Sequence, residues 1–144
     1  MFNGRYDLKL DPKGRLVLPS KIKGAIPESN GAALMLQMAA DRCLKLYPMV
    51  EFRKLESQVN ALSDHNEETR RLKRSFFTRI TEVELDSAGR FLIPKSFQEF
   101  AGLDKDVILI GVGTKIEMWS ANRIEGNVIM DDSEMSQQME KHLS

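Results

Sequence analysis

The chain has 144 residues, of which 42% are hydrophobic, and this suits one compact domain or two small half-domains that share a core. No run of about 18 apolar residues is present, which excludes a membrane-spanning helix, and the first residues lack the apolar segment of a secretory signal. The single cysteine, Cys43, excludes an internal disulfide and favours a reducing cytosol. The formal net charge is zero, but residues 1–24 and 67–79 are basic and the tail from residue 131 is acidic. A local positive field of this kind can attract phosphate even when the whole molecule is neutral.

The first predicted element is a strand in which Tyr6, Leu8 and Leu10 alternate with polar residues. A tight turn follows, because Pro12 suits the first central position of a type I turn and Gly14 suits the left-handed position that closes a three-residue loop. Such a hairpin places Asp11 and Arg15 opposite each other, with Cβ atoms roughly 4.5–5.5 Å apart. The D-x-x-x-R spacing therefore predicts a cross-strand ion pair at the mouth of a hairpin.

After the turn, the apolar run "LVL" at 16–18 predicts a strand buried on both faces, which Pro19 ends. A short helix follows, since proline is also favoured at the start of a helix. Two further strands are predicted from "ALMLQM" at 33–38 and "CLKLY" at 43–47.

The same order then repeats. "LDPKGRLVLP" at 10–19 recurs as "LDSAGRFLIP" at 85–94, an offset of 75 from Asp11 to Asp86. Later the offset becomes 72, so that Tyr47 in "CLKLYP" corresponds to Trp119 in "KIEMWS", and we expect both aromatic side chains in the core. The second copy predicts a buried strand "FLI", a helix that ends at Gly102, and the strands "VILIGV" and "KIEMW". The sequence thus indicates an internal duplication.

Helices are predicted between and after the copies. Residues 49–62 place apolar side chains near one face, and residues 66–77 carry the basic cluster "RRLKR". A third helix is predicted from Ala121 to about Met139, with loosely ordered residues after it.

These features resemble the MraZ family, in particular the opening "MFNG", the two D-x-x-x-R hairpins, "CLKLYP", "RRLKRSFF" and "EFAGL…VILIGVGTKIEMWS". The similarity runs from residue 1 to about 125. It implies an α+β, mainly β fold: a swapped-hairpin β-barrel of the AbrB-like type, built from two tandem pseudo-symmetric hairpin and helix repeats. The implied units are a first repeat at 5–50, a helical link at 51–78, a second repeat at 79–122, and a C-terminal helix and tail at 123–144.

The resemblance also implies a function. Members of the family are bacterial transcriptional regulators that bind repeated promoter boxes, typically ahead of the division and cell-wall gene cluster, and they assemble into rings. The expected partners are double-stranded DNA and further copies of the chain. The expected location is the cytoplasm, in association with the nucleoid. No cofactor, metal, membrane or small-molecule substrate is expected.

The predicted DNA-binding residues are the two arginines, their acidic partners and basic residues of the first hairpin, namely Arg15, Lys13, Asp11, Arg5, Lys9, Arg90 and Asp86. On spacing alone, each D-x-x-x-R pair is either an arginine aimed at phosphate or guanine, or a simple ion pair worth about 0–1 kcal/mol. The second loop, "DSA", has no lysine, so our hypothesis is that the first copy reads DNA. The second copy would then chiefly close the barrel or contact a neighbouring subunit. Three positions depart from the family pattern: Lys23 and Gln98 replace an expected arginine, and Ile124 replaces an aromatic residue.

The residues disfavour two other classes of protein. An enzyme is disfavoured because His65 and His142 belong to no recognisable triad or metal spacing and no phosphate-binding glycine loop is present. A protein-interaction scaffold or an antitoxin-like protein is disfavoured because such antitoxins usually carry one hairpin unit and a disordered tail. The basic cluster "RRLKR" leaves two roles open, a second DNA contact or pairing with acidic faces of a neighbouring subunit, of which we favour the second.

Overall fold

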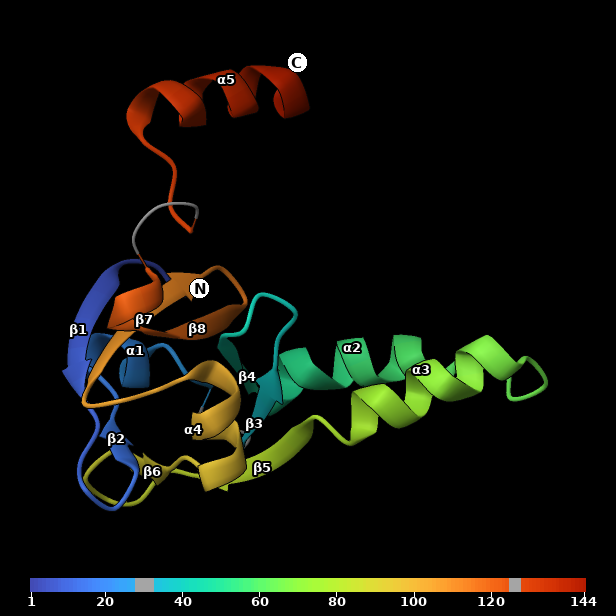
Figure 1. Ribbon diagram of the computed structural model, residues 1–144, viewed down its shortest axis with the longest axis horizontal. Coiled ribbons are helices and arrows are strands. Elements are labelled where there is room, and N and C mark those ends of the chain that lie inside the picture. The colour runs from blue at the N-terminus through green and yellow to red at the C-terminus, as the bar shows by residue number, and fades with distance from the viewer. Residues whose placement is uncertain (28–32, 125–127) are drawn as a thin grey trace.

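The computed structural model describes residues 1–27, 33–124 and 128–144. Each sequence repeat becomes a strand, a tight turn, a second strand, a short helix and two longer strands (Figure 1). In the first repeat these are β1 (Arg5–Lys9), β2 (Arg15–Val17), α1 (Ser20–Gly24), β3 (Ala33–Met38) and β4 (Leu44–Pro48). In the second they are β5 (Ile80–Glu84), β6 (Arg90–Leu92), α4 (Lys95–Ala101), β7 (Asp106–Val112) and β8 (Lys115–Ser120). The predicted order of elements in both copies is confirmed.

The two repeats exchange strands. One antiparallel sheet has six strands in the order β1-β7-β8-β4-β3-β5, so the first strand of each repeat pairs with the third strand of the other. β2 and β6 pair only with each other, in a separate two-stranded ribbon. The fold is therefore mixed α and β with mostly antiparallel strands. Within the described ranges, the strands form these two sheets and do not close into one barrel.

The predicted hairpins are correct at their turns and wrong along their strands. Pro19 and Pro94 precede the short helices as expected, and Gly102 ends α4 with a positive φ of 61°. However, β1 and β2, on the two sides of the turn, belong to different sheets, because β1 pairs with β7 and β2 pairs with β6. Each hairpin is therefore closed only at its tip.

The main core lies between the inner face of the six-stranded sheet and the ribbon. Leu16 of β2 and Phe91 of β6 point inward and join one buried cluster with residues of β3, β4, β7 and β8. The prediction that "LVL" and "FLI" are buried on both faces is wrong, since Val17 is 50% exposed and Leu92 is 55% exposed. A ribbon of two strands covers the sheet with one face only, and its other face meets solvent.

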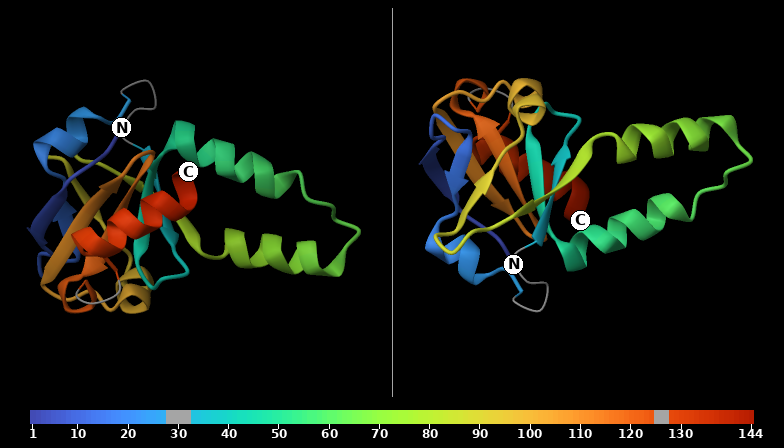
Figure 2. Two further views of the ribbon diagram at one scale, coloured as in Figure 1. Left: turned by 90° about the horizontal axis from the view of Figure 1, so that it is seen from above. Right: turned by 90° about the horizontal axis from the view of Figure 1, so that it is seen from below.

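The link between the repeats forms an arm of two antiparallel helices that projects from the sheet, α2 (Met49–Asn60) and α3 (Glu67–Phe77) (Figures 1 and 2). Phe52 anchors the arm, because its buried ring packs edge-on against Tyr47 at a centroid distance of 5.8 Å. Phe76 of α3 stacks on Phe52 at 5.9 Å. Asn66 caps the start of α3 by accepting hydrogen bonds from two backbone amides of the first turn. Both predicted link helices are confirmed.

The C-terminal prediction is only partly correct. A single 3-10 turn, Ala121–Arg123, follows β8 in place of a long helix, and the predicted span 121–139 includes residues 125–127, which lie outside the described part. A helix, α5, runs from Asp132 to Leu143 instead, capped by Asp131 and separated from the sheet in Figure 1. None of the described helices is long and apolar enough to cross a bilayer.

Candidate nucleic-acid interface

The Asp11 side chain builds the first turn. Its Oδ1 accepts the backbone N–H groups of Lys13 and Arg15, at 2.9 and 2.8 Å, and its Oδ2 accepts the Nε–H of Arg15 at 2.8 Å. Gly14 occupies the left-handed position with φ 83°, and its amide donates to the Asp11 carbonyl. The predicted turn and ion pair are both confirmed, and one carboxylate holds both.

The second turn repeats this geometry. Asp86 accepts the backbone amides of Ala88 and Arg90, each at 2.9 Å, and the Nε–H of Arg90 at 2.8 Å. Gly89 has φ 76°. The two arginine side chains are 35% and 40% exposed, so both are accessible from solvent.

These contacts lower the pKa of both carboxyl groups. The backbone amide of Arg15 is the largest cause for Asp11, and the backbone amide of Arg90 is the largest cause for Asp86, with the guanidinium groups adding to each. Both groups are therefore ionised at neutral pH. A guanidinium has five N–H donors and the carboxylate uses only Nε–H, so the terminal nitrogens of each arginine are not used by this bond.

The ribbon brings both arginines to one surface. In the β2–β6 pairing, Arg15 lies opposite Leu92 and Val17 lies opposite Arg90. These four side chains share the outer face, because the pair between them, Leu16 and Phe91, points into the core. The arginines are diagonal neighbours, roughly 7–8 Å apart at the backbone. The residue pattern alone does not predict this arrangement, since it places the two copies in separate hairpins, whereas the family resemblance implies that the hairpins are swapped.

The other predicted site residues lie in different places. Lys13 is exposed in the first turn, beside Asp11. Lys9, at the end of β1, forms an ion pair with Asp106 of β7. Arg5 begins β1, four residues further from the turn, which is about 13 Å along an extended strand. Of the three lysine and arginine residues predicted near the first motif, only Lys13 belongs to the turn itself.

A lysine from the other repeat lies beside the second turn. Gly89 packs against the aliphatic stem of Lys23 from α1, and a β-carbon added to this glycine would lie only 3.3 Å from the lysine Cδ. At the equivalent place, the Gln98 side chain lies over Gly14 and donates to the Ile93 carbonyl at 2.7 Å. Each short helix therefore covers the turn of the other repeat. Strand exchange supplies the second turn with the lysine that its own loop lacks, and nothing in the local sequence signals this.

Other chemistry-bearing residues do not gather at this site. Within the described ranges, no group of three or more His, Cys, Asp or Glu residues could hold a metal ion. Cys43 is buried in a smaller apolar cluster, and burial raises the pKa of its thiol to about 12.

Comparison with known sequences identifies the family of this chain. A family model described as "MraZ protein, putative antitoxin-like" matches residues 1–75 and again residues 76–141. The chain belongs to the MraZ family. Each matched segment contains one of the two repeats, so the sequence comparison finds the same duplication that the turns show.

Curated MraZ relatives are similar over most of the chain. A protein of Cytophaga hutchinsonii is 42% identical over 143 residues, covering 99% of this chain and 95% of the relative. One of Thiobacillus denitrificans is 38% identical over 128 residues, covering 89% and 86%, and one of Heliobacterium modesticaldum is 40% identical over 123 residues, covering 85% and 83%. Each of these relatives is named "Transcriptional regulator MraZ".

Proposed function

We propose that this protein is a DNA-binding transcriptional regulator and that the outer face of the β2–β6 ribbon is its DNA interface. One observation carries the proposal: two arginines, each fixed by a carboxylate-capped turn, lie together on one exposed ribbon. The names of the MraZ relatives support the regulatory role. The exchange of strands between repeats supports an AbrB-like, swapped-hairpin origin of the fold.

The ribbon suits the major groove of DNA, which is about 12 Å wide and admits a two-stranded β-ribbon. Each guanidinium, held at Nε, presents its remaining donors to phosphate oxygens or to the O6 and N7 acceptors of guanine. The exposed side chains of Val17 and Leu92 lie between the arginines and suit contact with thymine methyl groups. Lys13 and Lys23, one at each turn, add contacts with the phosphate backbone.

The first motif is expected to contribute more than the second. Lys13 is exposed in its turn, and Lys95 lines a shallow cavity of about 360 Å³ beside the same turn. The second turn has Lys23 beside it and Ala88 at the position of Lys13. Because its own loop has no lysine, the asymmetry between the copies remains part of the proposal.

Several copies are needed for tight binding. The chain has no net charge, and one ribbon neutralises only a few phosphates, so a single box should be bound weakly. We propose that a ring of subunits meets repeated promoter boxes, typically ahead of the division and cell-wall genes, and gains affinity through effective concentration. Such a regulator would act in the cytoplasm at the nucleoid.

Replacing each arginine separately tests the interface. Arg15→Ala and Arg90→Ala should each weaken binding to the DNA upstream of the protein's own gene in a mobility-shift assay, because each bidentate contact is worth about 1–3 kcal/mol, or about five- to 150-fold. The loss should be larger for Arg15→Ala. Arg53→Ala, an exposed arginine on α2, is the matched control and should bind as wild type. Unchanged binding by both ribbon variants would refute the interface, and equal losses would refute the asymmetry.

The number of boxes tests the avidity. Removing boxes one at a time, or changing their spacing by half a helical turn, should lower the affinity much more than in proportion to the number of boxes. A single box bound as tightly as several would contradict the proposed role of assembly.

A further inference from the structure

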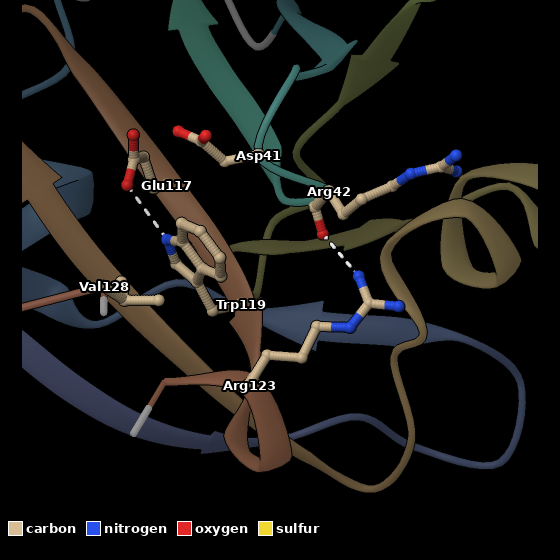
Figure 3. Close-up of a pocket in the computed structure, with 6 residues that line it drawn as sticks. All are labelled: Asp41, Arg42, Glu117, Trp119, Arg123 and Val128. Carbon is tan, nitrogen blue, oxygen red and sulfur yellow. Dashed lines mark hydrogen bonds between the residues drawn. The ribbon is translucent and has the colours of Figure 1, made fainter. Parts of the chain in front are cut away.

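A cavity of about 580 Å³ opens beside β8, and its lining comes from both repeats. It is lined by Asp41, Arg42, Glu117, Trp119, Arg123 and Val128 (Figure 3). The first two residues belong to the loop between β3 and β4, the next two to the outer face of β8, and the last two follow that strand. None of these residues belongs to the proposed DNA interface.

The repeat shows what covers the corresponding surface in the first half. Trp119 corresponds to Tyr47 and, at the same offset of 72, Ile124 corresponds to Phe52. Phe52 packs on Tyr47, and Phe76 from the arm stacks on Phe52. In the second half Ile124 packs in the small cluster with Trp119, but among the described residues no aromatic side chain takes the place of Phe76. The cavity therefore lies where the first half carries its helical arm.

The charges around the cavity suit a cation beside the indole. Glu117 accepts the Trp119 Nε1–H at 2.9 Å, and the Asp41 and Glu117 carboxylates lie on the same side of the cavity in Figure 3. The two lining arginines have other partners: the Arg42 guanidinium lies 4.7 Å from the centre of the Phe100 ring, pointing away from Trp119, and Arg123 donates to the Arg42 carbonyl at 2.9 Å. Trp119 itself is only 5% exposed, so an arginine entering from outside would meet the small accessible part of the indole and the two carboxylates.

The chain itself presents such arginines. On α3, Arg70 and Lys73 turn toward the tip of the arm, where both bind Asp64. Arg71 and Arg74 are exposed on α3, whose half-buried positions are those facing α2. Because the arm projects away from the sheet, these two side chains are presented to another molecule (Figure 2).

We infer that the cavity beside Trp119 receives Arg71 and Arg74 of the arm of a second copy of this chain. A guanidinium of α3 lies against the accessible part of the indole and forms ion pairs with Asp41 and Glu117. The contact is heterologous, since it joins the arm of one copy to the cavity of the next, and repeated contacts of this kind close into a ring or continue as a filament. The inference deepens the assembly part of the proposed function and rests on it.

Charge reversal tests the contact from both sides. Arg71→Glu/Arg74→Glu should lower the self-association constant by about tenfold or more, measured by sedimentation velocity and native mass spectrometry, because like charges then meet in a partly desolvated site. Asp41→Arg, in an exposed loop, should do the same. Combining both changes in one chain should restore much of the assembly. Arg53→Glu, on the other helix of the arm, is the matched control and should assemble as wild type.

A second measurement separates this contact from DNA binding. Each variant is titrated with a duplex that holds one box, for which assembly gives no advantage, and it should bind as wild type. Arm variants that assemble normally but lose DNA affinity would overturn the inference in favour of α3 as a DNA contact. A wild-type protein that stays monomeric, or arm variants that assemble normally with DNA binding intact, would overturn it as well. Loss of assembly from Met135→Ser/Met139→Ser on α5 alone, with the arm variants unaffected, would assign the contact to α5. In every case the binding of the single box by Arg15→Ala reports on the ribbon separately.

Discussion

The two repeats are alike at their turns and unlike where their last strands end. Both turns carry an aspartate that binds two backbone amides and one arginine, with hydrogen bonds that agree to about 0.1 Å. After β4, however, a long helical arm begins at Met49 and carries Phe52 in its first turn, whereas after β8 the chain makes one 3-10 turn that ends just before Ile124. The duplicated part is thus the part that presents arginine to solvent, and the part that differs decides which surface is covered.

This difference gives the molecule two unlike ends on one pseudo-symmetric body. One half carries an arm, whereas Trp119 of the other half borders a cavity of about 580 Å³. Copies of one chain associate either through the same surface on both or head to tail, and an arm meeting a cavity is a contact of the head-to-tail kind. In the proposals made above, the asymmetry of the link serves assembly and the symmetry of the ribbon serves DNA binding.

The largest expected effect comes from the residue that anchors the arm. Phe52→Ala should lower the free energy of unfolding by about 3–5 kcal/mol, because the ring is fully buried between Tyr47 and Phe76. Its counterpart Ile124→Ala removes a smaller side chain and should cost about 2–3 kcal/mol, toward the low end of such substitutions. Urea denaturation of both variants measures the difference.

Hydrogen exchange sharpens the same comparison. Phe52→Ala should speed exchange across α2 and α3, since their contact with the sheet depends on this ring, and Ile124→Ala should leave the arm unaffected. Faster exchange in the arm of the Ile124→Ala variant would show that the stability of the arm depends on packing around Ile124, which would contradict this prediction.

Local features were predictable from sequence because their causes are local. The positive φ of Gly14 and Gly89 and the pairing of Asp11 with Arg15 follow from a few adjacent residues. The exposed Val17 was not predictable, since a strand of three apolar residues shows no alternation and only its pairing decides which side is buried. Strand exchange depends on contacts far apart in the chain, such as β1 with β7, which hydrophobic periodicity does not encode. The position of Lys23 over the second turn follows from that exchange and was missed for the same reason.

The two turn glycines should differ in their response to alanine. Both have positive φ, so either substitution should cost about 1–2 kcal/mol from backbone strain alone. A β-carbon on Gly14 would also collide with the end of the Gln98 side chain and displace its hydrogen bond to the Ile93 carbonyl, whereas one on Gly89 would press on the flexible stem of Lys23. Gly14→Ala should therefore be the more destabilising, by about 1 kcal/mol.

A double-mutant cycle identifies the cause of that difference. Gln98→Ala should remove the additional cost of Gly14→Ala and leave the cost of Gly89→Ala unchanged, as measured by urea midpoints. Additive effects of Gly14→Ala and Gln98→Ala would show that the collision is absorbed elsewhere.

The smallest expected effect is the dependence of stability on pH through the two turn aspartates. Their pKa values are lower in the folded protein than the ordinary 3.8, so each contributes stability that is fully present above that value and is lost as the pH falls through the lower folded value. Asp11→Asn and Asp86→Asn keep an oxygen that can accept the backbone amides but remove the charge facing each arginine. Each should be modestly less stable than wild type at pH 7, and the gap in urea midpoint should narrow as the pH is lowered below 3.8. Because the hydrogen bonds are equivalent in the two turns, the urea midpoints of the two variants should depend on pH in the same way. If the difference from wild type persisted at low pH in only one variant, the two turns would differ energetically although their geometry agrees.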